Sequence, residues 1–168
     1  NLWLDPFSSI TGETSDGYIY GEDNTYSSAR STANSASISS VLYVGQNYFN
    51  SGSPDYIDTY TVYRVYLDFN TSSLPDDANV TNVNLSLAVM EDLSDNNFDV
   101  LIYEFNWTEP ITGANHEVNY DAVGAKNNRT WRNTAPLTTE TYYNNTGVLN
   151  ISWINLTGDT KYQLRSSL

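Results

Sequence analysis

The sequence has no cysteine and only one histidine, His116. The absence of cysteine excludes disulfide bonds, thiolate nucleophiles, cysteine-ligated zinc and iron–sulfur clusters. A single imidazole excludes a metal site built from several histidines, and a Ser-His-Asp triad would have to use His116. Several common catalytic chemistries therefore lack the side chains that they need.

Positive charge is also scarce. Seven Lys and Arg residues stand against 20 Asp and Glu residues, which gives a net charge of −13 and an isoelectric point near 4.1. Such a chain is repelled by phosphate backbones and by anionic membrane surfaces. No apolar run is long enough to cross a bilayer. We therefore expect no nucleic-acid partner and no membrane span.

Small polar residues and aromatic residues dominate what is present. The 168 residues include 21 Asn, 19 Ser and 18 Thr, whereas charged residues make up 16%, below the roughly 25% of an ordinary globular domain. Aromatic residues reach 14%, with 14 Tyr and four Trp, which suits β-strands and argues against a disordered chain. This composition predicts an extracellular β protein of one domain.

Acceptor triplets for N-glycosylation, Asn-X-Ser/Thr, are unusually frequent. Chance accounts for several of them in a chain so rich in Asn, Ser and Thr. Asn84 and Asn150, however, fall on the polar register of segments whose other register is apolar, where a bulky glycan can be accommodated. We expect covalent N-glycans and an extracellular or cell-surface location. The triplets begin at Asn70, Asn79, Asn84, Asn106, Asn128, Asn144, Asn150 and Asn155.

Alternation of apolar and polar residues predicts several β-strands. In the segment 61–69 the odd positions from 63 onward are aromatic or apolar, while Arg64, Tyr66 and Asp68 share the other register. The segment 80–89 alternates in the same way, with one face expected to be buried and the other wet. Shorter strands are predicted within 16–23, 147–153 and 160–166, and the segment 98–105 is apolar on both registers and is expected to be a central strand.

The remaining long segments show no helical periodicity over three turns. Residues 24–40 have loop character, and 107–146 is expected to hold short strands or a helical turn, because long structureless loops are uncommon in compact domains. Short and evenly punctuated strands are typical of β-sandwiches. The predicted fold class is therefore all-β, an antiparallel β-sandwich of jelly-roll type.

Four blocks of sequence then resemble a known family. They are DGYIYGEDNTYSSARSTA, LYVGQNYFNSG, YRVYLDFNTSSLPDDANVTNVNLSLAV and ISWINLTGDTKYQLRSS. In this order they are similar to the disaggregatase-related, or DNRLRE-type, domain of surface and secreted proteins of methanogenic archaea, over about residues 16–167. The resemblance implies a β-jelly roll, usually one of several in a large extracellular protein. In some cases such domains are attached to polysaccharide-degrading enzymes or classed as carbohydrate-binding.

Members of that family continue past the LRSS block into one or two further strands, whereas this chain stops at Leu168. We expect residues 16–168 to form the sandwich and residues 1–15 to be an N-terminal extension. Its apolar residues Leu2, Trp3, Leu4 and Phe7 are predicted to add as a donor strand to a neighbouring copy, beside the strand that ends near Ser166. Repeated head to tail, this contact builds a homopolymeric filament.

Acidic residues supply two further candidates. Carboxylate pairs such as Glu104 with Glu109 could in principle serve glycoside hydrolysis, but with 20 carboxylates such pairs are unavoidable and a solvated acidic surface is the simpler interpretation. We therefore expect a non-catalytic module. The loop containing Asp92, Asp95 and Asp99 has the oxygen ligands of a structural calcium site, although its spacing differs from an EF-hand and an ordinary Asn/Asp turn is the better explanation. No cofactor is required.

Carbohydrate is the other candidate ligand, because aromatic rings stack on sugar rings. The predicted contacts are Tyr66 beside Arg64 on the outward register of 61–69, with Tyr48, Trp107 and Trp131 in loops; core packing is the alternative for each. The sequence thus favours an extracellular structural glycoprotein, a subunit of an archaeal surface filament, sheath or matrix assembled by strand addition. The alternatives are a carbohydrate-binding module of a polysaccharide-acting protein and, more weakly, an acidic adhesin domain.

Overall fold

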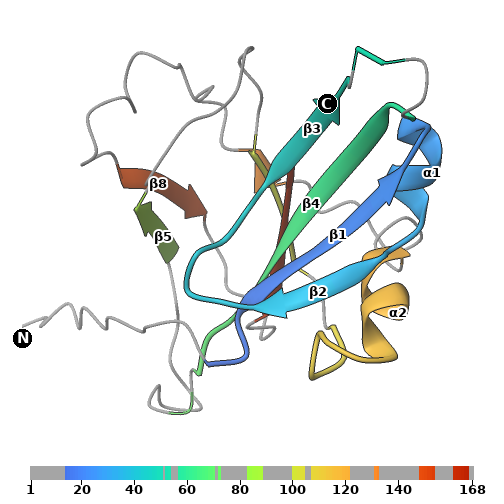
Figure 1. The fold of residues 1–168 in the computed structure, drawn as a ribbon. Coiled ribbons are helices and arrows are strands. Elements are labelled where there is room, and N and C mark those ends of the chain that lie inside the picture. Colours follow the sequence, from blue (N-terminus) through green and yellow to red (C-terminus); the bar gives the residue numbers. More distant parts are fainter. Residues whose placement is uncertain are drawn as a thin grey trace, which may run out of the picture.

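The computed structural model describes residues 14–50, 52–53, 57–70, 72, 83–88, 100–104, 107–121, 131–132, 148–153 and 161–166. These residues form nine strands, paired only antiparallel, and two short helices (Figure 1). The fold is therefore sheet-rich, as expected. In chain order the elements are β1 (Gly17–Asp23), α1 (Tyr26–Ser31), β2 (Ser35–Ile38), β3 (Gly45–Phe49), β4 (Thr59–Asp68), β5 (Val83–Ala88), β6 (Val100–Glu104), α2 (Asn115–Asp121), β7 (Trp131–Arg132), β8 (Val148–Trp153) and β9 (Lys161–Ser166).

The larger sheet is organised around β4. Its strand order is β2-β1-β4-β9-β6-β7, and β3 joins it as an additional partner of β4. One edge of β4 pairs with β1, whereas the other edge is shared, because β3 pairs with its first half and β9 with its second half. The sheet therefore divides along β4. One branch is the four-stranded unit β2-β1-β4-β3, in which β2 and β3 are the outer strands.

The strand β9 is an inner strand of this sheet. Gln163 at its centre lies opposite Tyr66 of β4 on one side and Tyr103 of β6 on the other. β4 pairs with residues 161–164 of β9 and β6 with residues 162–166, so most of both edges of β9 are occupied within this sheet, which disfavours the expected receiving groove beside the strand that ends near Ser166. The donor residues assigned to that groove, Leu2, Trp3, Leu4 and Phe7, lie outside the described residues.

The segment 98–105 behaves as its sequence predicts. Its strand β6 lies between β9 and β7, so it is a central strand. A strand that is apolar on both registers can be covered on both faces, which is the usual position for such a sequence. The expectation of short elements within 107–146 is likewise confirmed, by α2 and β7.

A second sheet consists of β5 and β8 and stands apart from the four-stranded unit in Figure 1. Its register places Asn84 opposite Ser152, and Asn150 opposite Ser86. Because side chains alternate along a strand, both acceptor asparagines occupy register positions of the same face. The apolar positions of the two strands are paired with one another on the other register. This agrees with the alternation found in the sequence.

The segment 24–40 was expected to be a loop, and this expectation is wrong, because it contains α1 and β2. Thr25 caps α1: its side-chain oxygen accepts a hydrogen bond from the backbone N–H of Ser28 at 3.3 Å. Asp23 accepts one from the backbone N–H of Thr25 at 3.1 Å. A helix of six residues is too short to show periodicity, so capping and the complete burial of Ala29 define it instead.

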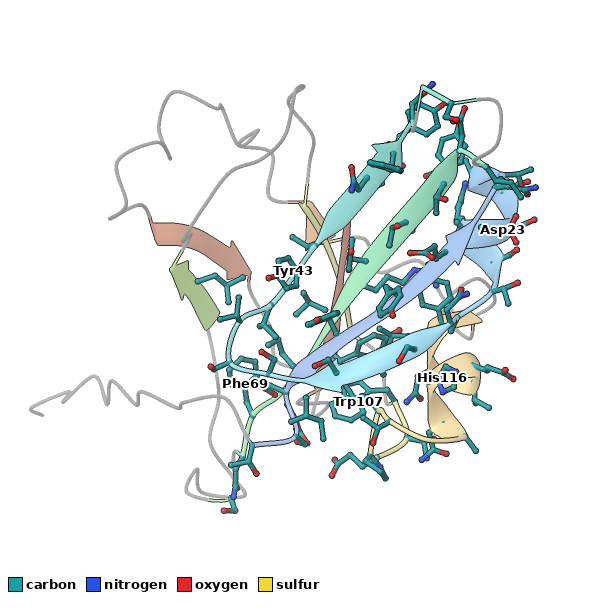
Figure 2. The ribbon with its side chains drawn as sticks, viewed as in Figure 1. Asp23, Tyr43, Phe69, Trp107 and His116 are labelled. Carbon is teal, nitrogen blue, oxygen red and sulfur yellow. The ribbon has the colours of Figure 1, made fainter. Side chains whose placement is uncertain are left out.

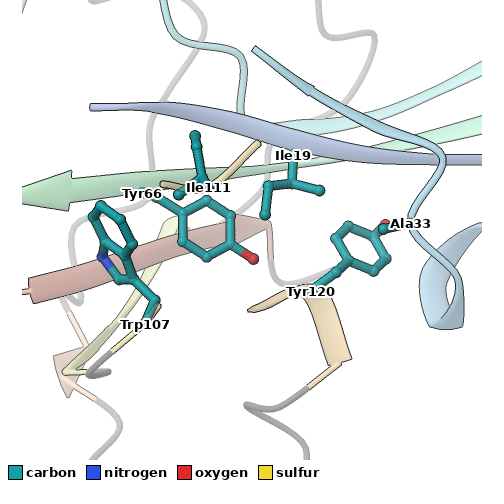
Figure 3. Packing of buried hydrophobic residues seen from close by; sticks show 6 residues of the cluster. All are labelled: Ile19, Ala33, Tyr66, Trp107, Ile111 and Tyr120. Carbon is teal, nitrogen blue, oxygen red and sulfur yellow. The ribbon is translucent and has the colours of Figure 1, made fainter. Parts of the chain in front are cut away.

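A cluster of buried apolar residues lies on one face of β1 and β4 (Figure 3), here called the covered face. Strand residues supply one side of the cluster, and the segment 107–121 together with Ala33, which lies between α1 and β2, supplies the other. Aromatic rings make up half of it, and Tyr66 meets Trp107 edge-to-face at 6.0 Å between ring centroids. The cluster consists of Ile19, Ala33, Tyr66, Trp107, Ile111 and Tyr120, with Ala36 packed against it.

Two glycines of β1 allow this close packing. A Cβ atom at Gly21 would collide with the backbone carbonyl oxygens of Ala29 and Thr32, and one at Gly17 would come within 2.7 Å of the Ile111 side chain. Gly17, Ile19 and Gly21 share one register of the strand. Small residues on either side of Ile19 therefore let α1 and the segment around Ile111 approach the sheet.

Candidate functional site

A group of tyrosine rings lies on the opposite face of the four-stranded unit, here called the open face. We define the tyrosine surface as Tyr18 and Tyr20 of β1, Tyr63 of β4 and Tyr43 of the β2–β3 connection. Their ring centroids are 5.1–6.0 Å apart in the contacting pairs. Tyr43 is 48% exposed and the other three are half-buried. Figure 2 shows Tyr43 beside the start of β3, away from Trp107 and His116.

The strand registers explain why the rings meet. Tyr20 lies directly opposite Tyr63, and Tyr63 in turn lies opposite Gly45 of β3. Cross-strand neighbours on one face interact directly, so the first pair forms a ring contact. Gly45 contributes no side chain on the other side of Tyr63, and its φ of 131° is one that favours glycine. The ring of Tyr43, 5.7 Å from that of Tyr63, lies next to this position.

A polar row runs beside the tyrosines on the same face. Two residues further along each strand, and so on the same face, Glu22 of β1 lies opposite Thr61 of β4, which lies opposite Asn47 of β3. The Thr61 hydroxyl donates a hydrogen bond to Glu22 Oε2 at 3.4 Å. Glu22 and Asn47 are exposed. The open face therefore combines apolar ring surface with a carboxylate and an amide that can bind hydroxyl groups.

Burial raises the pKa of Tyr63 above its ordinary value of 10.0, and the neighbouring Tyr18, Tyr20 and Glu22 act in the same direction. Removing a hydroxyl from water disfavours the charged phenolate. The ring therefore stays neutral at physiological pH and presents aromatic carbon and a hydroxyl group. Such a surface suits a neutral ligand better than an ion.

A second tyrosine group is found near the end of β3. The rings of Tyr48 and Tyr60 are 4.7 Å apart, and Tyr26 of α1 lies 6.1 Å from Tyr60. The Tyr48 hydroxyl donates a hydrogen bond to Asp58 Oδ2 at 2.6 Å, and this bond raises its pKa. Asn50 donates to the same hydroxyl at 3.4 Å. These contacts hold an exposed ring in one orientation next to the β3 edge.

The carbohydrate contacts expected from the sequence are not at the surface. Tyr66 is fully buried, and Arg64 and Trp107 are 5% and 1% exposed. The expectation that the register of Arg64, Tyr66 and Asp68 faces solvent is therefore wrong for Arg64 and Tyr66, because α1, α2 and the segment around Trp107 cover it. Tyr48 is exposed as expected, and the side chain of Trp131 lies outside what the structure describes.

Arg64 contributes to the packing of the helices on β4 and not to a surface site. Its guanidinium lies 3.6 Å from the centroid of the Tyr120 ring. Nη2 donates to the carbonyl oxygen of Arg30 at 2.6 Å, and Nη1 donates to that of Tyr120. These carbonyls belong to the last turns of α1 and α2, where a cation is favoured by the helix dipole. Arg64 therefore ties both helices to β4.

Other predicted site residues are placed as follows. Asn70 is exposed just after β4. Its Oδ1 atom accepts a hydrogen bond from the backbone N–H of Ser72 at 3.0 Å. This bond does not involve Nδ2, the atom to which a glycan would be attached. Asn84 and Asn150 are on β5 and β8, as described above. The calcium candidates Asp92, Asp95 and Asp99 and the acceptors Asn79, Asn106, Asn128, Asn144 and Asn155 lie outside the described residues.

Within the described part of the chain there is no group of three or more His, Asp and Glu residues placed to hold a metal ion. The imidazole of His116 is next to the carbonyl oxygen of Gly113 in the turn before α2. None of the helices in the described ranges is long and apolar enough to cross a membrane. The most developed surface feature in these ranges remains the tyrosine surface.

The tyrosine surface is not among the sites predicted from the sequence. Alternation in 61–69 assigns Tyr63 to the inner register together with Val65 and Leu67; these two are buried, whereas Tyr63 is only half-buried. A usable signal was present in GYIYG, where Tyr18 and Tyr20 alternate with two glycines and Ile19. The glycines mark the register that another element approaches closely, so the tyrosines belong to the face that is less covered.

The comparisons with known proteins add no relative. No family model matches the sequence, and neither the curated proteins nor the solved structures contain a significant match. The resemblance to the disaggregatase-related domain therefore stays a prediction.

Proposed function

We propose that the chain is a non-catalytic, extracellular carbohydrate-binding module, and that the tyrosine surface is its binding site. The observation that carries this proposal is the contiguity of Tyr18, Tyr20, Tyr63 and Tyr43 on a partly exposed sheet face beside Glu22 and Asn47. The predicted jelly-roll fold and the resemblance to domains attached to polysaccharide-degrading enzymes agree with it. The protein binds its ligand and does no covalent chemistry.

The chemistry of the surface favours a neutral polysaccharide. The C–H groups on one face of a pyranose pack against aromatic carbon, and its hydroxyl groups form hydrogen bonds with carboxylate and amide oxygens. Ring positions fixed by neighbouring rings lose little conformational entropy when a ligand binds. With a net charge of −13 and Glu22 beside the rings, an anionic polymer is repelled.

Retention of the purified chain on neutral polysaccharides, compared with an array of glycans, tests the proposal. Tyr43→Ala removes an exposed ring from the tyrosine surface, and we expect at least a tenfold loss of affinity, about 1.4 kcal/mol. Tyr48→Ala is the matched control, because Tyr48 is also 48% exposed but occupies the opposite register. Equal retention of the two variants, or no glycan bound by the wild type, would overturn the assignment.

A second candidate function is a structural subunit of an archaeal surface filament, sheath or matrix, assembled through strand addition. β4 and β6 flank most of β9, but the outer edge of β3, which pairs with no described residue, is another place for strand addition. N-glycosylation is expected for both candidate functions. Mass spectrometry of protein from the native source would detect a glycan on Asn70, the acceptor whose exposure is described.

A further inference from the structure

We propose that the outer edge of β3 is a self-association site that pairs with β3 of a second copy of the chain. β3 pairs with β4 along one edge only, and no described residue pairs with its other edge. In Figure 1 it lies at the margin of the four-stranded unit, on the side away from β2. An outer strand presents unpaired backbone N–H and C=O groups, which can pair with another strand.

The sequence of β3 lacks the features that protect such edges. Natural edge strands are usually guarded by charged residues, especially lysine, by proline or by a covering element. The segment 41–50 contains no charged residue and no proline. Its exposed residues Tyr48 and Phe49, at 48% and 61%, point to opposite faces of the strand. An unguarded edge with apolar residues on both faces is suited to pairing.

Exposed apolar side chains are concentrated in the stretch of sequence that contains β3. Among the described residues, seven large hydrophobic side chains are exposed, and all but Val118 lie between Ile38 and Ile57. Two of them, Tyr48 and Phe49, belong to β3 itself, whereas Ile38 ends β2 at the other margin of the unit. Exposed apolar residues gathered on an unpaired edge mark a surface that makes a contact.

The distribution of charge along the chain favours a second copy of the chain as the partner of this edge. No Asp, Glu, Lys, Arg or His occurs between Arg30 and Asp55, although the chain as a whole carries a net charge of −13. Two copies repel one another at most approaches and meet at the lowest electrostatic cost where both are neutral. A cationic partner would instead be drawn to the acidic surfaces. The residues of β3 itself carry no charge, and the nearest described carboxylate, Asp58, accepts a hydrogen bond from Tyr48 at one end of the strand. The edge of β3 is therefore complementary to the same edge on a second copy.

Pairing of identical edges gives a twofold, self-complementary contact. Antiparallel β3 strands would join two four-stranded units into one continuous sheet, with Tyr48 and Phe49 of each copy covered on either face. The tyrosine surface stays accessible in this arrangement, so a dimer presents two copies of it. This inference is independent of sugar binding, because it rests on the backbone edge of β3 and not on the tyrosine rings.

Sedimentation velocity of the full chain over a range of concentrations measures the association. We expect a monomer–dimer equilibrium that strengthens as salt screens the repulsion between the two copies. Phe49→Lys should weaken the dimer at least tenfold, whereas Val118→Lys, at a residue of almost the same exposure on α2, should leave it unchanged. A protein that stays monomeric at all concentrations and salt levels overturns the proposal, as does an equal effect of the two lysine variants.

Two further measurements keep the inference testable without relying on one variant. Hydrogen exchange of the wild type should show slower exchange of β3 amides at dimer-forming concentrations. Deletion of residues 1–10 should leave the dimer intact. If the deletion abolishes it, the edge is filled by the N-terminal segment of a neighbour and β3–β3 pairing is wrong. Tyr48→Lys, on the register of β3 opposite to the tyrosine surface, should also weaken the dimer but keep the polysaccharide retention of the wild type, which separates the two proposals.

Discussion

The two faces of the four-stranded unit are made by alternate residues of the same strands and yet differ in kind. On the covered face Ile19 and Tyr66 are fully buried beneath α1, α2 and the segment around Trp107. On the open face Tyr20 and Tyr63 remain half-buried, although Val65 and Leu67 further along the same register of β4 are buried. The difference teaches that the alternation of residues along a strand determines which side chains share a face. Which face is exposed to solvent is decided by short elements far away in the sequence that cover the other face.

The covered face is held by hydrogen bonds as well as by packing. Tyr120 donates to the carbonyl oxygens of Ala29 at 2.8 Å and Val62 at 3.1 Å, and Tyr66 donates to that of Asn119 at 3.1 Å. These bonds satisfy buried polar groups that would otherwise be costly. The open face has ring contacts in their place. We therefore expect substitutions on the covered face to affect folding and those on the open face to affect binding.

The largest effect should come from Tyr66→Ala compared with Tyr63→Ala. Both remove a tyrosine ring from β4, but Tyr66 fills a closed cluster and loses a buried hydrogen bond. We expect Tyr66→Ala to reduce the free energy of unfolding by about 3–5 kcal/mol, and Tyr63→Ala to reduce it by about 1–2 kcal/mol. Denaturation with guanidinium chloride measures both. Equal losses would show that the two faces are equally closed.

An intermediate effect is expected for Arg64→Lys. Lysine keeps the charge but cannot reach both carbonyl oxygens, those of Arg30 and Tyr120, with one planar group. We expect a loss of about 1–3 kcal/mol in the free energy of unfolding. Arg30→Lys is the control, because that side chain is exposed, and it should change stability by no more than about 0.5 kcal/mol. If the free energy of unfolding of Arg64→Lys equals that of the wild type, the two hydrogen bonds of the planar guanidinium contribute nothing to stability.

The strands were predictable because they depend on local alternation. The segment 61–69 and the apolar segment 98–105 both contain strands close to the expected limits, β4 and β6. Their partners were less accessible, since β9 pairs with β4 across about a hundred residues of sequence and no local pattern records this. For that reason the sequence did not reveal that β4 and β6 flank most of β9, where the receiving groove was expected.

The site was harder to predict than the strands. Arg64 and Tyr66 follow the polar register of β4, and nothing local in 61–69 reveals that the last turns of two short helices meet Arg64 there. Helices of six and seven residues leave no periodic pattern. The tyrosine surface likewise depends on the register between β1, β4 and β3, which single strands do not specify.

The smallest expected effect is a pH dependence on the open face. The pKa of Tyr63 is raised in the folded protein, chiefly by burial, whereas in the unfolded chain it returns to about 10. The neutral ring therefore contributes stability that is fully present below pH about 10 and is lost as the pH rises through the folded pKa. Unfolding measured in steps of pH should show this loss, and Tyr63→Phe should reduce its slope.

Tyr48 makes the comparison sharper, because its pKa is also raised but mainly by the hydrogen bond to Asp58. Asp58→Asn should lower the pKa of Tyr48, so that one tyrosine ionises at a lower pH in an ultraviolet titration, and should leave the pKa of Tyr63 unchanged. Tyr48 is exposed, so solvent screens its interaction and the change in stability should be smaller than for Tyr63→Phe. If Tyr63→Phe changes neither the late part of the titration nor the alkaline slope, Tyr63 is as accessible to water as Tyr48, and the open face is more open than its ring contacts indicate.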